Sequence, residues 1–368
     1  MRILFVINSF FYGGAEKLVF DLVKSICSKC EQVSVAALYR MENDMEERIM
    51  QSLKQEGVKT YILDKKAGSD RIATVRKLCK IVKEDNIQLI HAHCSVPMLM
   101  GKLAGCIAGA KVVCTVHNTR GYKIMLEKLT GWMVHGYVSI GQAAEEYMLD
   151  NLGIKKNKIT CIYNAVDTNR FQTGEQIAGF WRKWGFDNNV PVVVNVGRVV
   201  PQKNQLCLVR AVKKCYSLGK PIQCAILGGF DGASETYKTL QEYIHANELE
   251  ERIRFLGQQE EIPVFLKNCD CFVMTSVYEG LSVSYLEAVL CGVPIVTTDL
   301  PFVRELQRFG NTAVIIPQND ADALADILLN RSYTPPNDET ISHYRENFSL
   351  SKFAEAHLQL YNQIVGGI

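Results

Sequence analysis

The sequence carries little net charge, no long hydrophobic run and no glycine-rich dinucleotide motif. Its 41 lysines and arginines nearly balance 39 aspartates and glutamates, and a total of +2 gives no indication of nucleic-acid binding. The longest apolar tract, residues 96–116, is interrupted by lysines and glycines, whereas a membrane-spanning helix needs about 20 mostly apolar residues. We therefore expect no transmembrane helix. The absence of Gly-x-Gly-x-x-Gly argues against a nicotinamide-dependent oxidoreductase.

Disulfides and a secretory leader are not indicated either. The 13 cysteines are odd in number and lack framework spacing, which is typical of free thiols in a reducing compartment. The N-terminal segment has too short an apolar core for a signal peptide, so we predict a first strand at residues 3–7. We expect a cytoplasmic protein.

The sequence does contain a regular alternation of β-branched runs and amphipathic stretches. The candidate strands are residues 3–7, 33–38, 89–92, 111–116, 137–140 and 159–162, followed after a polar stretch by residues 192–196, 223–227, 253–256, 271–275, 295–298 and 314–316. This order predicts βαβ units and two doubly wound, parallel-sheet α/β domains. Because ligands bind beyond the carboxyl ends of parallel strands, we expect the domains to face each other across a cleft.

Two motifs of the first half follow candidate strands. Gly13 and Gly14 precede a helical pattern, whose N-terminus would offer N–H groups to a phosphate; a tight turn that requires glycine is the alternative. His117 follows the strand at 111–116, where an imidazole can donate to a sugar hydroxyl or move a proton. A satisfied polar residue at a strand end is the other interpretation of His117.

In the second half, Arg198 and Lys203 lie on the loop after the strand at 192–196. Two cations at the carboxyl end of a strand suit a diphosphate, whose charge they neutralise without a metal. Each residue singly is also typical of a solvated loop.

The segment 275–288 predicts a strand end, a glycine-containing turn and a helix that begins near Ser282. Glu279 and Glu287 are eight residues apart, about 12 Å along a helix, which is too far for the carboxylate pair of a glycosidase. The spacing suits opposite ends of a nucleotide sugar, with the helix N-terminus between them binding an anion.

Three motifs of metal-binding type are interpreted as structural. The Asp-x-Asp motif at 320–322 opens a helical pattern, which favours an N-cap. The Cys-x-x-Cys motif at 27–30 has no second pair, and the His-x-His motif at 91–93 has no obvious third ligand, so we favour substrate-loop or core histidines there. We predict no metal site.

Together these residues resemble glycosyltransferase family four, the retaining nucleotide-sugar transferases with two Rossmann-like domains in the type B fold. The motifs, in chain order, are Gly13-Gly14-Ala15-Glu16, Val116-His117-Asn118, Ile162-Tyr163-Asn164-Ala165-Val166-Asp167, Gly197-Arg198 with Lys203-Asn204, and Glu279-Gly280 with Glu287. The resemblance spans nearly the whole chain. It implies an acceptor-side domain at 1–165, completed by a C-terminal helix at 349–368, and a nucleotide-sugar-binding domain at 166–348.

The resemblance also implies a role for each candidate site residue. Arg198 and Lys203 would hold the donor diphosphate, Glu287 the ribose hydroxyls and Glu279 the donor sugar. The backbone N–H groups of Gly280, Leu281, Ser282 and Val283 would donate hydrogen bonds to the donor, and the loop at Gln258 would contact the base. In the first domain, Gly14 would face the phosphate and His117 would contact the sugar. The candidate catalytic residues are therefore Glu279, His117, Arg198 and Lys203.

The activity implied by the resemblance is hexosyl transfer from a nucleotide diphosphate sugar, with UDP preferred, to a glycan or lipid-linked acceptor in polysaccharide or cell-surface glycan synthesis. The family's route is same-face attack with retention, in which the departing phosphate takes the acceptor's proton and no metal or other cofactor is required. A nucleotide-sugar epimerase and a non-catalytic nucleotide-sugar-binding protein are the alternatives.

Charge is unevenly distributed along the chain, because residues 1–170 are basic on balance and the remainder is acidic. Cations gather beside apolar residues that include Trp132, and they are Lys65, Lys66, Arg71, Arg76, Lys77, Lys80, Lys83, Arg120, Lys123 and Lys128. We expect this surface to contact anionic lipid peripherally, at the inner face of a membrane, although solvated helix faces explain it as well.

Overall fold

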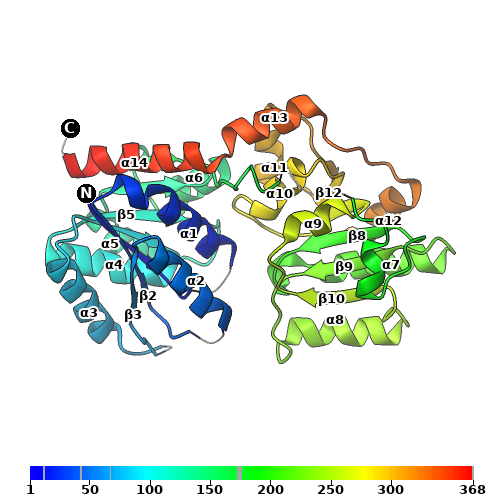
Figure 1. Ribbon diagram of the computed structural model, residues 1–368, viewed down its shortest axis with the longest axis horizontal. Helices are drawn as coiled ribbons and strands as arrows, with labels where there is room; N and C mark the ends of the chain where they lie inside the picture. Colours follow the sequence, from blue (N-terminus) through cyan, green and yellow to red (C-terminus); the bar gives the residue numbers. More distant parts are fainter. Residues whose placement is uncertain (11–12, 42–43, 67, 172–175, 367–368) are drawn as a thin grey trace. The chain divides into compact units, whose positions relative to one another are not determined.

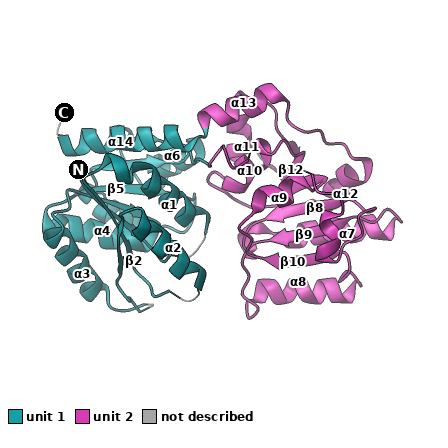
Figure 2. Ribbon diagram, in the orientation of Figure 1, with its two compact units in different colours: residues 1–166, 348–368 teal, residues 167–347 magenta. Residues whose placement is uncertain are grey.

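The computed structural model describes residues 1–10, 13–41, 44–66, 68–171 and 176–366. The chain divides into two α/β units (Figure 1 and Figure 2): unit 1 comprises residues 1–166 and 348–368, and unit 2 comprises residues 167–347. The domain boundaries expected from the sequence differ from these by one residue. No helix among the described residues is long and apolar enough to cross a membrane.

Unit 1 is built on a seven-stranded parallel sheet in the order β3-β2-β1-β4-β5-β6-β7. Its strands are β1 (Arg2–Ile7), β2 (Gln32–Ala37), β3 (Lys59–Ile62), β4 (Leu89–His93), β5 (Lys111–Val116), β6 (Gly136–Ser139) and β7 (Ile159–Cys161). The central strands are buried, as expected of β-branched runs covered by helices on both faces. The strand order reverses between β1 and β4, which is where a doubly wound sheet binds its ligand.

The helices of unit 1 are α1 (Gly14–Ile26), α2 (Asp44–Gln55), α3 (Arg71–Glu84), α4 (Ser95–Ala108), α5 (Ile124–Thr130), α6 (Gln142–Asp150) and α14 (Leu350–Gly366). Helix α4 packs so closely on the sheet that a Cβ atom on Gly105 would lie 2.3 Å from a methyl group of Val112. The apolar tract at 96–116 is thus a helix, a left-handed turn at Gly109 and the predicted strand at 111–116.

The C-terminal segment belongs to unit 1. The Val166 N–H donates to the Phe348 carbonyl over 3.0 Å, and Ser349 forms a bridge with Val166. Helix α14 then packs against α1 and buries Phe353, Leu360 and Tyr361. This return is the one that the family resemblance implied.

Unit 2 has a six-stranded parallel sheet in the order β10-β9-β8-β11-β12-β13, with the reversal between β8 and β11. Its strands are β8 (Val192–Val196), β9 (Gln223–Leu227), β10 (Ile253–Gly257), β11 (Cys271–Met274), β12 (Ile295–Thr298) and β13 (Val314–Ile316). The helices are α7 (Gln205–Ser217), α8 (Glu235–Ala246), α9 (Ile262–Lys267), α10 (Val283–Leu290), α11 (Pro301–Leu306), α12 (Ala321–Asn330) and α13 (Asp338–Asn347).

The predicted fold class, two doubly wound parallel-sheet domains, is confirmed. Each of the twelve predicted strands occurs within one residue of its expected bounds, and the sequence analysis missed only β3 among the described strands. All 13 cysteines are free thiols, as expected.

Candidate functional site

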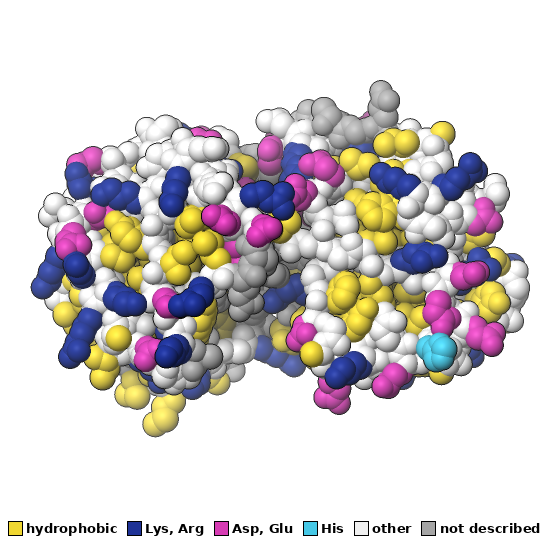
Figure 3. Space-filling view, turned by 60° about the horizontal axis from the view of Figure 1, so that its bottom comes forward, with side chains coloured by type: hydrophobic (Ala, Val, Ile, Leu, Met, Phe, Trp, Pro, Cys, Tyr) yellow, Lys and Arg dark blue, Asp and Glu magenta, His cyan; other side chains and the backbone are white. Residues whose placement is uncertain are grey.

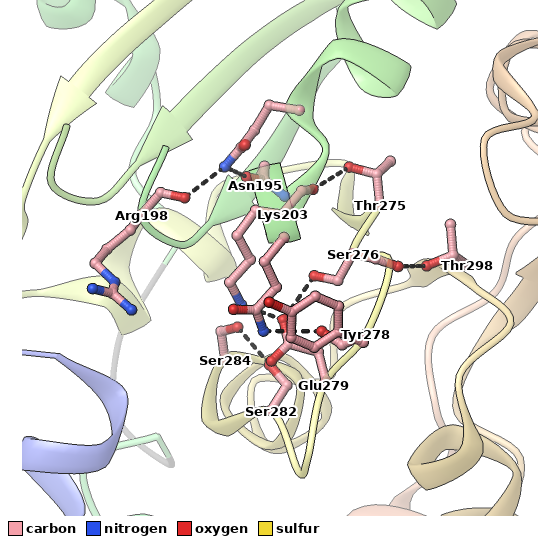
Figure 4. A network of polar contacts seen from close by, with 12 residues as sticks. Asn195, Arg198, Lys203, Thr275, Ser276, Tyr278, Glu279, Ser282, Ser284 and Thr298 are labelled. Carbon is pink, nitrogen blue, oxygen red and sulfur yellow. Dashed lines mark hydrogen bonds and ion pairs between the residues drawn. The ribbon is translucent and has the colours of Figure 1, made fainter. Parts of the chain in front are cut away.

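A polar network occupies the carboxyl ends of β8 and β11, at the switch point of the second sheet (Figure 4). The Lys203 Nζ atom lies 2.6 Å from Oε1 of Glu279, and the Ser276 hydroxyl donates to the same oxygen over 2.8 Å. The side chains of Lys203 and Glu279 are only 16% and 9% exposed. The structure therefore joins two of the predicted site residues directly.

Backbone contacts between the two loops hold this pair in place. The Val277 N–H donates to the Gln202 carbonyl over 2.8 Å, and the Gln202 amide donates to the Tyr278 carbonyl over 2.9 Å. The Thr275 hydroxyl donates to the Lys203 carbonyl over 3.0 Å. Because each loop satisfies the other's polar groups, these contacts fix the backbone that carries the ammonium and the carboxylate.

Glycine at 197 makes room for the lysine. A Cβ atom there would lie 2.9 Å from Cε of Lys203, and a Cβ atom on Gly228, whose φ is +138°, would lie 2.3 Å from the Gly197 carbonyl oxygen. The Gly197 N–H donates to the Leu227 carbonyl over 2.8 Å, which joins the loops after β8 and β9. The Gly197-Arg198 motif thus has a packing role as well as its expected ligand role.

Arg198 lies on the same loop but does not join the ion pair. Its side chain is exposed, and its guanidinium points away from Lys203 and Glu279 (Figure 4). The Arg198 carbonyl accepts from the Gln205 amide over 3.0 Å, so its backbone is fixed while its side chain projects from the loop. The two predicted diphosphate cations therefore differ, since one is ion-paired and the other extends outward.

The predicted anion-binding turn precedes α10. Ser282 is the N-cap residue, as the sequence indicated, but its hydroxyl is 3.0 Å from that of Ser284 and does not cap the helix. Gly280, Leu281 and Ser282 are buried, and Val283 is half-buried. Glu287 is a buried residue of α10, whereas Glu279 lies in the loop before it, so a helical spacing does not describe the two carboxylates.

Gln258 follows β10 at the same edge of the second sheet. The Gly228 N–H donates to the Gly257 carbonyl over 2.8 Å, which ties the loops after β9 and β10 together. Gly257 has a φ of +67°, a value that favours glycine, and Gln258 is half-buried beside it. The residues predicted for the base and for the diphosphate therefore share one edge.

In unit 1, His117 belongs to a buried group of four histidines. Its Nε2 atom lies 3.0 Å from Nδ1 of His93. His91 contacts the Tyr361 hydroxyl at 2.6 Å and its ring centroid is 5.6 Å from that of His357, so α14 closes the group. The sequence analysis missed the roles of His93 and His357; the His-x-His motif was the available signal.

Burial keeps these rings neutral. It lowers the pKa of His117 and of His357 to about 4, and it lowers the pKa values of His91 and His93 well below their usual range. The Nε2 atom of His93 is buried without a hydrogen-bond partner among the described residues. Because orphaned buried N–H groups are rarer than orphaned acceptors, the unpartnered Nε2 atom favours the tautomer in which His93 carries its proton on Nδ1 and donates it to Nε2 of His117. In that tautomer, the neutral His117 ring carries its own proton on Nδ1.

Gly14 is the first residue of α1 and is exposed. A Cβ atom on it would meet nothing within 4 Å, and the preceding Gly13 has a φ of −100°, which any residue adopts. Backbone geometry therefore gives no support to a turn that requires glycine, and the open approach to the helix N-terminus remains as the interpretation.

The Asp-x-Asp motif is a helix cap, as predicted. The Asp320 carboxylate accepts from the Ala323 N–H over 2.8 Å, and Asp322 pairs with Lys214 at 2.9 Å. Among the described residues, no three His, Cys, Asp or Glu side chains are arranged to hold a metal ion.

One part of the expected basic surface is wrong. Lys65 is buried, where its ammonium donates to the Lys66 carbonyl over 2.8 Å and lies 5.4 Å from the centre of the Tyr39 ring. Lys77 donates to the Leu63 carbonyl over 2.6 Å. Lys65 is therefore not part of an exposed basic surface, whereas Lys77 stays exposed and ties α3 to the segment after β3.

Two family models match the chain, one to each unit. The model described as Glycosyltransferase Family 4 matches residues 12–170, and the model described as Glycosyl transferases group 1 matches residues 180–339. The chain belongs to glycosyltransferase family four. This family membership makes the protein a hexosyltransferase.

Relatives and solved structures agree with this family. A UDP-Gal:α-D-GlcNAc-diphosphoundecaprenol α-1,3-galactosyltransferase of Escherichia coli is 27% identical over 267 residues, which are 68% of each chain. An N,N'-diacetylbacillosaminyl-diphospho-undecaprenol α-1,3-N-acetylgalactosaminyltransferase of Campylobacter jejuni is 30% identical over 47% of this chain and 45% of its own. The Anabaena protein HepE, solved with UDP and glucose, has the same fold, with a TM-score of 0.83 at 21% identity over 98% of this chain and 99% of HepE.

Proposed function

We propose that this family four glycosyltransferase moves a hexose-type sugar from a UDP-sugar to a lipid-linked or glycan acceptor, with retention of the anomeric configuration. The main support for a nucleotide-sugar donor is the Lys203–Glu279 pair at the β8/β11 switch point. UDP is supported by HepE, which was solved with UDP and with UDP-glucose. A lipid-linked acceptor is supported by the two relatives that act on diphosphoundecaprenol-linked sugars.

For each candidate residue we propose the role that the family resemblance implies. Lys203 and the extended Arg198 neutralise the donor diphosphate, and the N–H groups at 280–283 add the positive end of α10. Glu279 holds donor-sugar hydroxyls, Glu287 the ribose and Gln258 the base. In unit 1, the Nδ1–H of His117 donates to the donor sugar, and the N-terminus of α1 at Gly14 faces phosphate.

The chemistry needs charge stabilisation more than a covalent intermediate. As the glycosidic bond breaks, negative charge grows on the leaving diphosphate, and preorganised cations and backbone donors stabilise that charge without reorganising. The departing phosphate then takes the proton of the acceptor hydroxyl on the same face of the sugar. No metal is required for this route in our proposal.

We also propose that the enzyme works in the cytoplasm, at the inner surface of a membrane, with unit 1 in peripheral contact with anionic lipid. Exposed cations on α3 and around α5, such as Arg76, Lys80 and Lys128, support this contact. Cosedimentation with vesicles of anionic phospholipid at low salt tests it. Equal recovery with neutral vesicles would refute it.

The proposed binding of a UDP-sugar donor is tested first by thermal shift with UDP, GDP, ADP and their common sugar conjugates. A ligand at 100 times its dissociation constant stabilises the native state by about 2.7 kcal/mol. We expect UDP and one UDP-sugar to raise the melting temperature of the wild type and to lose most of that effect in Arg198→Ala and Glu287→Ala. Lys238→Ala, an exposed position on α8, is the matched control.

The stereochemical outcome and the epimerase alternative are settled by product analysis. An α-linked donor should give an α-linked product by NMR, and a β-linked product would exclude retention. A new sugar nucleotide formed from the donor alone would identify an epimerase instead.

A further inference from the structure

An apolar groove of about 1040 Å³ lies on the surface of unit 1, with α3, α4 and α5 as its walls. Its inner lining comes from Val75 and Cys79 of α3, Leu99 and Leu103 of α4, and Leu126 of α5. The groove lies wholly within unit 1, and none of the polar site residues described above lines it. It is therefore a feature separate from the candidate active site.

Large apolar side chains at this groove are exposed to solvent. Ile72 on α3 is 71% exposed and Ile107 on α4 is 65% exposed. The surface continues onto α5 and the turn after it, where Met125, Leu129 and Trp132 are 77%, 64% and 68% exposed. Exposed apolar side chains gathered on neighbouring helices in this way mark a site for an apolar partner.

Cations of α3 line one side of the groove. They are Arg71, Arg76, Lys80 and Lys83, and Glu84 is the acid among the lining residues, 3.6 Å from Lys80. Figure 3, a view with the bottom of Figure 1 turned forward, shows lysines and arginines set among hydrophobic side chains on unit 1. An apolar floor under a cationic rim fits an amphiphile with a hydrocarbon chain and an anionic head.

We propose that this groove binds the hydrocarbon chain of a membrane lipid that carries a phosphate or diphosphate, and that the rim cations bind the phosphate. The proposal rests on the proposed function in one respect, because it identifies this lipid with the lipid part of the acceptor. A bilayer is its source, and the exposed side chains of α5 and Trp132 form the side from which the lipid enters.

The direction of the groove relates it to the sheet. In a parallel α/β unit the N-termini of the helices lie at the carboxyl edge of the strands. Arg71 is at the start of α3 and Leu99 is in the second turn of α4. These two residues therefore mark the end of the groove nearest His93 and His117. A phosphate at the Arg71 end would place an attached sugar toward that edge. The chain would extend toward Ile107.

A buried ion pair keeps the α5 wall in place. The Lys102 ammonium of α4 contacts the Glu127 carboxylate of α5, and both side chains are buried. Lys102 also donates to the Thr130 hydroxyl over 3.3 Å. Since α5 has only seven residues, this ion pair anchors the short helix to α4 and keeps Leu126 facing the groove.

The native cysteines test the proposal without a destabilising substitution. Cys79 lies in the groove wall, whereas Cys161 on β7 is exposed elsewhere in unit 1. The probe is farnesyl phosphate below its micellar concentration, and the readout is the alkylation rate of each cysteine by N-ethylmaleimide, followed by peptide mass spectrometry. At ten times the dissociation constant, Cys79 alkylation should slow about tenfold while Cys161 is unaffected. Equal rates at Cys79 with and without probe would overturn the proposal.

Two variants separate the chain site from the rim. Leu103→Trp fills the groove and should abolish protection of Cys79, and Lys80→Glu with Lys83→Glu should weaken farnesyl phosphate at least tenfold while leaving farnesol unchanged. Lys54→Glu, an exposed charge reversal on α2, is the control and should bind the probe like the wild type. The readout involves no sugar donor, so the groove and the proposed acceptor can fail separately. Protection of Cys79 without sugar transfer to a lipid-linked acceptor would support the groove and refute the proposed acceptor. Sugar transfer to such an acceptor without protection of Cys79 would support the acceptor and refute the groove.

Discussion

The ammonium of Lys203 and the carboxylate of Glu279 lie 2.6 Å apart, although 76 residues separate them in the chain. The charge of Lys203, which we propose to bind the donor diphosphate, is thus paired with a carboxylate. A donor must compete with Glu279 for this cation or share it. The pair therefore couples recognition of the diphosphate to the position of the carboxylate proposed to hold the sugar.

Glu279→Gln tests this coupling. The amide keeps an acceptor for Ser276 but releases Lys203, so UDP alone should bind as tightly as to the wild type or more tightly, while transfer from the UDP-sugar falls about 100-fold, the loss expected for a charged hydrogen bond to the sugar. Calorimetry with UDP and steady-state kinetics check the two effects. Parallel losses in UDP binding and transfer would mean that Glu279 serves only to hold the loop.

The Lys102–Glu127 pair predicts a strong and asymmetric effect on stability. Lys102→Met leaves a buried carboxylate without its partner and should lower the free energy of unfolding by about 3–5 kcal/mol. The double variant Lys102→Met with Glu127→Leu removes both charges and should recover most of that loss. Urea unfolding measures both. A double variant no more stable than the single one would contradict this account.

Much of the fold and part of the site could be predicted from the sequence, for identifiable reasons. Buried parallel strands are continuous β-branched runs, so all but β3 were found; β3 pairs only with β2, is partly exposed and begins at Lys59, so it lacks that signature. Local motifs placed Lys203 and Glu279 at strand ends. They did not reveal the ion pair, because no short-range pattern encodes a contact across 76 residues.

The histidine group is a second case in which a local motif does not reveal contacts between residues far apart in the chain. His91 and His93 are two residues apart on one strand and visible as a motif, but their partners are His117, directly after β5, and Tyr361 of α14, the last helix of the chain. Sequence reasoning assigned α14 to the first domain by resemblance alone. The contact of Tyr361 with His91 is one of the interactions that hold the helix on unit 1.

This group predicts acid sensitivity. Burial depresses the pKa of His117 and His357 to about 4, so the unfolded chain binds more protons than the folded one between about pH 6.5 and 4. Stability should therefore be fully present above pH 6.5 and fall as the pH decreases through this window, by up to about 1.4 kcal/mol per pH unit for each histidine. His357→Phe should flatten the profile measured by urea unfolding, whereas His245→Phe, at an exposed position, should not.

The Asp320 cap gives a prediction that also discriminates between a structural and a metal-binding Asp-x-Asp motif. Its carboxylate accepts from the Ala323 N–H at the start of α12, so Asp320→Ala should cost about 1 kcal/mol of stability. Asparagine caps helices as well as aspartate does, so Asp320→Asn should keep the stability and the transfer activity of the wild type. A metal ligand would behave otherwise, since a neutral amide binds a divalent cation more weakly than a carboxylate does. Transfer assays with and without EDTA, on the wild type and on Asp320→Asn, decide between the two: activity unchanged in all four measurements supports the cap, and loss with EDTA and in the asparagine variant together would show that the motif holds a metal.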